Sequence, residues 1–134
     1  MTEPIRIIER NAGDVTILEL QGRLVLDEGD VPFRKYVNRL VQDGRIKIIV
    51  DMRKVTRIDS VGIGILVAKY VTTYLRGGRL KLLNLTARGE TLMDITRLYT
   101  VFEIFESEDE AIRSFEHDRA SAVMPPIKEG PPKQ

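Results

Sequence analysis

The segment from Ile46 to Asp51 limits most strongly how this chain can fold. Residues 46–50 are nearly continuous in apolar side chains, and the run ends at Asp51. Such a run is typical of a strand that is covered on both faces, as in a parallel sheet flanked by helices. A short basic stretch follows, and a helical pattern begins at Ser60 and stops at Gly77. The sequence therefore predicts a strand, a loop from Asp51 to Ser60 at the carboxyl end of that strand, and a helix.

The remaining segments supply further strands and helices in alternation. Alternation and composition predict strands at residues 5–9, 15–20, 80–85 and 101–105, the first two forming a hairpin around a turn at 11–14. The candidate N-cap residues of the helices are Asp30, Ser60, Thr86 and Ser107. The resulting order is β-β-α-β-α-β-α-β-α. It indicates an α/β fold with a mixed, mostly parallel sheet that is opened by a β-hairpin and carries about four helices.

Helical spacing of apolar residues predicts which face of each helix packs on the sheet. In chain order, the predicted packing faces carry Phe33, Val37, Leu40 and Val41; then Val61, Ile65, Ala68, Thr72 and Leu75; then Leu92, Met93, Ile95 and Leu98; and finally Ala111, Ile112 and Phe115. These faces and the strands opposite them make up the predicted core.

Length and composition favour one domain in the cytoplasm. The 134 residues suffice for a single domain, which we place at 1–118, and residues 119–134 hold four of the six prolines and are expected to form a disordered tail. With 21 basic and 20 acidic residues, the chain lacks the basic excess of many nucleic-acid-binding proteins. No cysteine, no signal peptide and no apolar run long enough to span a membrane are seen.

No arrangement of residues indicates a hydrolase or a metal enzyme. His117 is the only histidine and lies near the end of the last predicted helix, where nothing suggests that it reaches Ser60. The G-x-S-x-G elbow of α/β hydrolases is absent. A single histidine and scattered carboxylates form no metal-binding spacing. We therefore expect no enzyme, with no catalytic residue and no metal site.

Two phosphate-related patterns are incomplete. Asp51, Asp59 and Glu103 do not follow the order of acidic residues in a phosphoaspartate receiver, because the first hairpin carries no acidic pair. Gly62-x-Gly64 is neither a Walker A loop nor a full dinucleotide-binding loop. We therefore expect no cofactor.

The start of the helix at Ser60 is the candidate functional feature. Ser60 can serve as the N-cap, because its hydroxyl can accept a hydrogen bond from a backbone N–H in the first turn. Gly62 and Gly64 each cost a helix about 1 kcal/mol relative to alanine. Two glycines in the first turns suggest that the backbone there is kept bare. With no base nearby in the sequence, the Ser60 hydroxyl is better interpreted as a substrate than as a reagent.

The segment around Ser60 resembles the signature of the STAS domain, which is named for sulphate transporters and anti-sigma factor antagonists. The usual form is a strand that ends in Asp-Leu, a loop, and Asp-Ser-x-Gly-Leu-Gly at the start of a helix. Here the corresponding residues are Asp51-Met52 and Asp59-Ser-Val-Gly-Ile-Gly64. Residues 77–83 and 98–115 match further parts of the pattern, and the resemblance covers about residues 4–117.

The resemblance implies a switch that acts by phosphorylation. In bacterial stand-alone members, a serine kinase that is also an anti-sigma factor phosphorylates the matching serine, and the unphosphorylated protein binds that partner and frees the sigma factor. Ser60 would then be the phosphoacceptor. The residues expected to contact the partner are Asp27, Thr56, Arg57, Asp59, Ser60, Val61, Gly62 and Gly64. A phosphatase that acts on phosphorylated Ser60 is a further expected partner, whereas nucleic acid is not.

One departure from the family pattern concerns the segment after the second strand. Many antagonists carry Gly-x-Leu-Asp there, and the aspartate contributes to partner contacts. In this chain Val25 stands at the matching place, and Asp27 is the candidate substitute from a slightly longer loop.

Two alternatives to the switch remain open. In one, Ser60 only caps its helix and the chain is a STAS scaffold subunit, for example in a stressosome-like assembly or a lipid-transport complex. In the other, the chain is a small enzyme or a nucleotide-binding domain of related topology.

Overall fold

The computed structural model describes residues 5–120 of the chain, and the predicted order of strands and helices is confirmed. The elements are β1 (Arg6–Ala12), β2 (Val15–Leu24), α1 (Asp30–Gln42), β3 (Lys47–Ile58), α2 (Ser60–Leu75), β4 (Arg79–Leu83), α3 (Ala87–Thr96), the short 3₁₀ helix η1 (Leu98–Thr100), β5 (Ile104–Phe105) and α4 (Glu108–Ala120). Most of the predicted tail, residues 121–134, lies outside the described residues.

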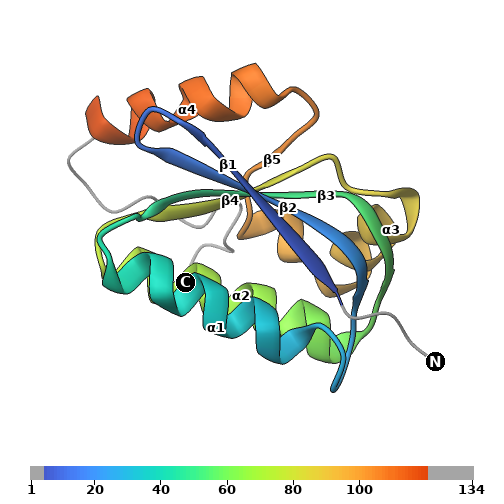
Figure 1. Ribbon diagram of the computed structural model, residues 1–134. Helices are drawn as coiled ribbons and strands as arrows, with labels where there is room; N and C mark the ends of the chain where they lie inside the picture. The colour runs from blue at the N-terminus through green and yellow to red at the C-terminus, as the bar shows by residue number, and fades with distance from the viewer. Residues whose placement is uncertain (1–4, 121–134) are drawn as a thin grey trace, which may run out of the picture.

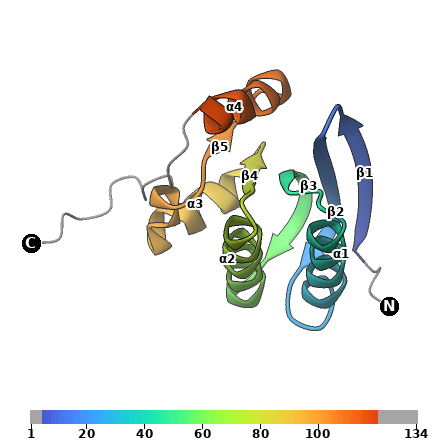
Figure 2. The ribbon, with the colours of Figure 1, turned by 90° about the vertical axis from the view of Figure 1, so that its left-hand side faces the viewer.

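The five strands form one mixed sheet in the order β1-β2-β3-β4-β5. β1 pairs with β2 in antiparallel orientation, and every other neighbouring pair is parallel. Helices α1 and α2 lie side by side against one face, and α4 lies against the other (Figure 1). Figure 2 shows α3 next to α2, toward the β5 edge of the sheet. The predicted α/β fold, opened by a hairpin, is therefore confirmed.

Each face of the sheet has its own apolar cluster. The larger one lies under α1 and α2 and includes Leu18, Phe33, Val50 and Leu66. The smaller one lies under α4 and contains Val15, Ile17, Ile49, Leu83, Ala111 and Phe115. Residues 48–50 of β3 are fully buried because their side chains alternate between these two clusters. This is the arrangement that the apolar run predicts.

β3 is longer than predicted, and the expected loop from Asp51 to Ser60 is wrong. The strand continues to Ile58, so only Asp59 separates it from α2. Two register shifts between β2 and β3 each place one extra residue in β3. Met52, Val55 and Ile58 are therefore all buried although they are three residues apart. The apolar period of two that marks a regular strand is lost, which explains why sequence reasoning missed it.

The packing face predicted for α2 is also wrong. The buried residues are Gly62, Ile63, Leu66, Lys69 and Thr73, whereas Leu75 is 75% exposed. Apolar residues occur all around this helix, so their spacing does not single out one face. Lys69 reaches Asn38 of α1, its Nζ donating to Oδ1 at 2.6 Å. Burial, with a further contribution from Arg34, lowers the pKa of Lys69.

Smaller differences concern the ends of elements. Gly29, not Asp30, is the N-cap of α1, and Ile95 is 71% exposed instead of packing on the sheet. β5 is reduced to Ile104–Phe105 because η1 precedes it. Ser107 caps α4 as predicted, accepting from the Glu110 N–H at 3.2 Å. α4 runs to Ala120, two residues beyond the predicted end of the domain.

Candidate functional site

Asp59, not Ser60, is the N-cap of α2, which corrects the prediction from sequence. The Asp59 backbone is extended (φ −117°, ψ −172°), and its Oδ1 accepts from the Gly62 N–H at 2.9 Å. Because β3 runs up to Ile58, Asp59 is the one residue left to take the extended backbone that an N-cap requires. Ser60 is consequently the first residue of the helix.

Asp59 also ties the turn after β2 to the start of α2. Its second oxygen, Oδ2, accepts from the Leu26 N–H at 3.2 Å. Burial raises the pKa of Asp59, but backbone N–H donors at Gly62, Leu26 and Val61 outweigh burial, so the pKa lies below its ordinary value. Asp59 is therefore held ionised beside Ser60. Figure 1 shows the β2–α1 connection at the same end of the molecule as the start of α2.

Replacing Asp59 with alanine is expected to cost about 1–2 kcal/mol of unfolding free energy at pH 7, because α2 loses its cap. A carboxyl whose pKa is lower in the folded state stabilises the fold above its unfolded pKa of about 4, and this contribution disappears as the pH falls through the folded pKa. The cost of Asp59→Ala should therefore shrink below about pH 4. Chemical denaturation of the wild type and of Asp59→Ala at pH 7 and pH 3 measures this change in unfolding free energy.

The matched control is Asp59→Asn. Asparagine caps helices about as well as aspartate but carries no charge. At pH 7 we expect Asp59→Asn to lose less unfolding free energy than Asp59→Ala. We also expect its stability to depend less on pH than that of the wild type. A cost of Asp59→Ala that does not change between pH 7 and pH 3 would contradict the assignment of the ionised carboxylate as the cap.

Ser60 presents its hydroxyl to solvent. Its side chain is exposed and, within residues 5–118, makes no hydrogen bond. Further along the outer side of α2, the exposed residues are Gly64, Ala68, Val71 and Leu75, at spacings of three or four. The one charged residue of α2, Lys69, is buried. Ser60 therefore stands at the end of an uncharged, largely apolar helix face, which we call the α2 outer face.

The two glycines of this helix have different surroundings. A Cβ on Gly62 would lie 2.1 Å from the Leu24 carbonyl oxygen and 2.9 Å from Ile58, whereas a Cβ on Gly64 would meet nothing within 4 Å. Gly62 is buried and allows α2 to approach the end of β2. The interpretation of Gly62 as bare backbone for a partner is therefore wrong, while Gly64 is exposed.

The structure brings most of the other predicted contact residues to the same end of the sheet. Thr56 and Arg57 are exposed near the end of β3, and Val61 is half-buried in the first turn of α2. Asp27 is exposed in the β2–α1 turn, with a left-handed backbone (φ +64°). Val25 is buried and cannot present a side chain in place of the family aspartate.

Sequence reasoning missed Leu26. It is 55% exposed beside Asp27, and its N–H binds Asp59. An apolar residue directly before the polar turn 27–30 is the only signal that the sequence offers for it.

Other kinds of site find no support among residues 5–118. No group of His, Asp or Glu side chains there is arranged to hold a metal ion. His117 is exposed on α4, on the opposite face of the sheet from α2 (Figure 1). Within the described part of the chain, no helix has the length and apolar character needed to cross a membrane.

A family model for the STAS domain matches residues 6–111. The chain therefore belongs to the STAS domain family, as the resemblance around Ser60 implies. Comparison with curated protein sequences gives no match.

Solved structures of anti-sigma factor antagonists share the fold. A candidate antagonist from Thermotoga maritima is 23% identical, with a TM-score of 0.77 over 82% of this chain and 94% of that one. An antagonist from Mycobacterium paratuberculosis is 19% identical, with a TM-score of 0.72 over 87% and 99%. The Bacillus cell fate determinant SpoIIAA in its phosphorylated form is 20% identical, with a TM-score of 0.65 over 83% and 98%.

Proposed function

We propose that the chain is an anti-sigma factor antagonist that is switched by phosphorylation of Ser60. In the unphosphorylated state it binds an anti-sigma factor of the serine-kinase type, and a sigma factor is released. Phosphorylation ends this binding, and a phosphatase restores it. The protein acts in the cytoplasm, as a binding switch rather than an enzyme, without contacting nucleic acid itself.

The observation that carries the proposal is the position of the Ser60 hydroxyl. It is exposed, makes no hydrogen bond within residues 5–118, and is not needed to cap α2, since Asp59 does so. A hydroxyl that the fold does not use is free to enter a kinase active site. The capping role that the scaffold alternative gave to Ser60 belongs to Asp59 instead.

The α2 outer face supports a protein as the partner. Exposed apolar side chains such as Val71 and Leu75, without charges between them, suit the central part of a protein interface. The proposed contacts extend from this face to Asp27, Thr56, Arg57 and Val61. Gly62 contributes indirectly, by fixing the position of the helix.

Electrostatics explains how the switch acts on binding without acting on folding. A phosphoserine adds about −1.5 to −2 charges. In the first turn of α2 the helix dipole favours this charge by about 0.3–1 kcal/mol. In an interface the same charge, next to the ionised Asp59, is desolvated and repelled.

The proposal predicts phosphorylation of Ser60 by a partner kinase. The chain is incubated with ATP and, one at a time, with the serine-kinase anti-sigma factors encoded in the same genome. Mass spectrometry should find one phosphate, on the peptide that contains Ser60, and none in Ser60→Ala. Phosphate on another residue, or none with any of these kinases, contradicts the proposal.

A further inference from the structure

A small pocket lies between the end of β3 and the start of α3. Its volume is about 230 Å³, and it is lined by Val55, Thr56, Arg57, Ile58, Thr86 and Arg88. Its lining residues come from the end of β3 and the start of α3, and α3 follows β4, the strand that lies next to β3 in the sheet. No carboxylate lines it, and two of its six lining residues are arginines.

Both arginines lack a partner in the described part of the chain. Arg57 and Arg88 are exposed, and within residues 5–118 neither side chain makes a hydrogen bond or an ion pair. Some other cations among residues 5–118 are paired, as Arg23 is with Glu28 at 2.9 Å and Lys54 with Glu19 at 3.4 Å, whereas others, such as Arg97, have no ion pair either. Two guanidinium groups without counter-ions make the pocket positively charged, and an anion bound there would neutralise this charge.

The start of α3 adds uncharged donors. Thr86 is the N-cap, and its Oγ1 accepts from the Gly89 N–H at 3.1 Å. The backbone N–H groups of Ala87 and Arg88 precede the first intrahelical hydrogen bond and are therefore available to a ligand. These N–H groups lie at the N-terminus of α3, where the helix dipole favours a negative charge.

The size of the pocket limits the ligand. The volume of about 230 Å³ is several times the roughly 30 Å³ that one water molecule occupies in liquid water. It is smaller than the roughly 300–1,000 Å³ of pockets that enclose a whole drug-sized ligand. It suits a tetrahedral oxyanion whose remaining substituent, if any, projects into solvent.

We propose that this pocket binds a phosphate group, as inorganic phosphate or as the phosphate of a monoester, with Arg57 and Arg88 as its charged ligands. Thr56, Thr86 and the first N–H groups of α3 complete the donor set. The inference does not rest on phosphorylation of Ser60, although Thr56 and Arg57 belong to both surfaces. Bound phosphate would occupy two of the residues proposed to contact the anti-sigma factor.

The test is a titration of the full chain with inorganic phosphate at low ionic strength, followed by backbone amide NMR. We expect saturable shifts at Ala87, Arg88 and Gly89. Removing one charge-assisted contact, in Arg57→Ala or Arg88→Ala, should weaken binding about tenfold or more. Arg88→Lys keeps the charge without the planar fork and should fall between wild type and Arg88→Ala.

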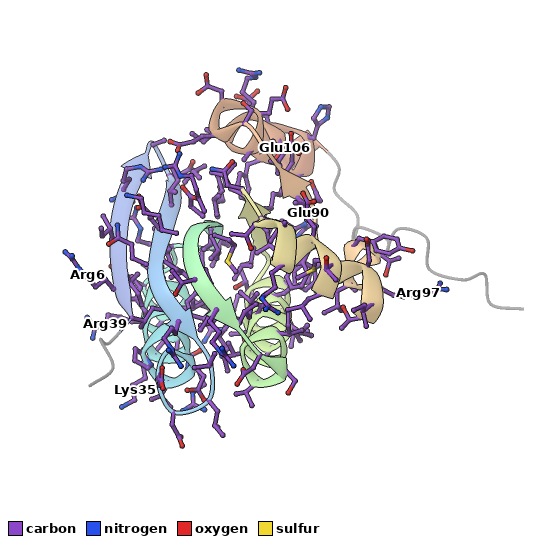
Figure 3. The ribbon with its side chains drawn as sticks, turned by 90° about the vertical axis from the view of Figure 1, so that its right-hand side faces the viewer. Arg6, Lys35, Arg39, Glu90, Arg97 and Glu106 are labelled. Atoms are coloured by element: carbon purple, nitrogen blue, oxygen red, sulfur yellow. The ribbon has the colours of Figure 1, made fainter. Side chains whose placement is uncertain are left out.

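The matched control is Arg97→Ala. Arg97 follows α3, is exposed, and points away from the rest of the molecule (Figure 3), so its loss should leave phosphate binding unchanged. Because Arg57, Arg88 and Arg97 are all exposed, their variants should fold, and unchanged amide spectra elsewhere in the chain verify this. Adenosine monophosphate and a phosphoserine peptide, titrated in parallel, show whether a small metabolite or a protein binds more tightly than phosphate itself.

The proposal is overturned if phosphate gives no saturable shift at the start of α3, or if chloride at equal ionic strength reproduces it. Equal affinity in wild type, Arg57→Ala and Arg88→Ala would overturn it as well. These outcomes are independent of the kinase assay, because Arg88 is not among the residues proposed to contact the anti-sigma factor.

Discussion

Replacing Gly62 with alanine should lower the free energy of unfolding by about 3 kcal/mol. The added methyl group would lie 2.1 Å from the Leu24 carbonyl oxygen and 2.9 Å from the Ile58 side chain. Because the contact involves backbone at the end of β2, α2 or the strand has to move. The better helix propensity of alanine, worth about 1 kcal/mol, offsets only part of this cost. Thermal unfolding should show a decrease in Tm of roughly 10 °C or more.

Gly64→Ala is the matched control, two residues further along the same helix. A Cβ there meets nothing within 4 Å, so the substitution should stabilise the fold by about 0.5–1 kcal/mol through helix propensity alone. Opposite signs for the two variants are expected. Equal effects would contradict the close packing of α2 against β2.

The contrast between these glycines shows what the sequence can and cannot predict. Both look alike in the sequence, as poor helix formers in the opening turns of α2. Only the position of Leu24, at the end of a strand 38 residues earlier, separates them. A local pattern indicates that a glycine is needed but not what lies against it.

Elsewhere the sequence predicted the elements well where their periodicity is regular. Residues 46–50, α1 and the order of elements follow directly from apolar patterning. The outer half of β3 was missed because its bulges place Met52, Val55 and Ile58 at a spacing of three. The buried face of α2 was missed because apolar residues surround the helix.

The candidate site shows the same division. Ser60 stands out in the sequence, and its exposure agrees with the role that the family resemblance implies. The capping role of Asp59 depends on β3 reaching Ile58, which the sequence did not reveal. Arg57 and Arg88 line the same pocket although they are 31 positions apart in the sequence, and only the fold shows this.

The second large effect is on binding. Ser60→Asp should weaken the complex with the kinase-type anti-sigma factor by about a hundredfold or more, because an added carboxylate beside Asp59 is desolvated in the interface. The same substitution should leave the Tm unchanged or slightly raised, since an acidic residue in the first helical turn suits the dipole. Ser60→Ala removes the hydroxyl without adding charge and should bind within a few-fold of wild type.

The most direct test of the central claim is therefore the affinity of one kinase-type anti-sigma factor for wild type, Ser60→Ala and Ser60→Asp, measured by calorimetry alongside the Tm of each variant. The phosphorylation switch predicts tight binding for the first two, loss of binding for Ser60→Asp, and similar Tm values for all three. A complex that forms equally well with Ser60→Asp would contradict the switch and favour a scaffold role for this STAS domain.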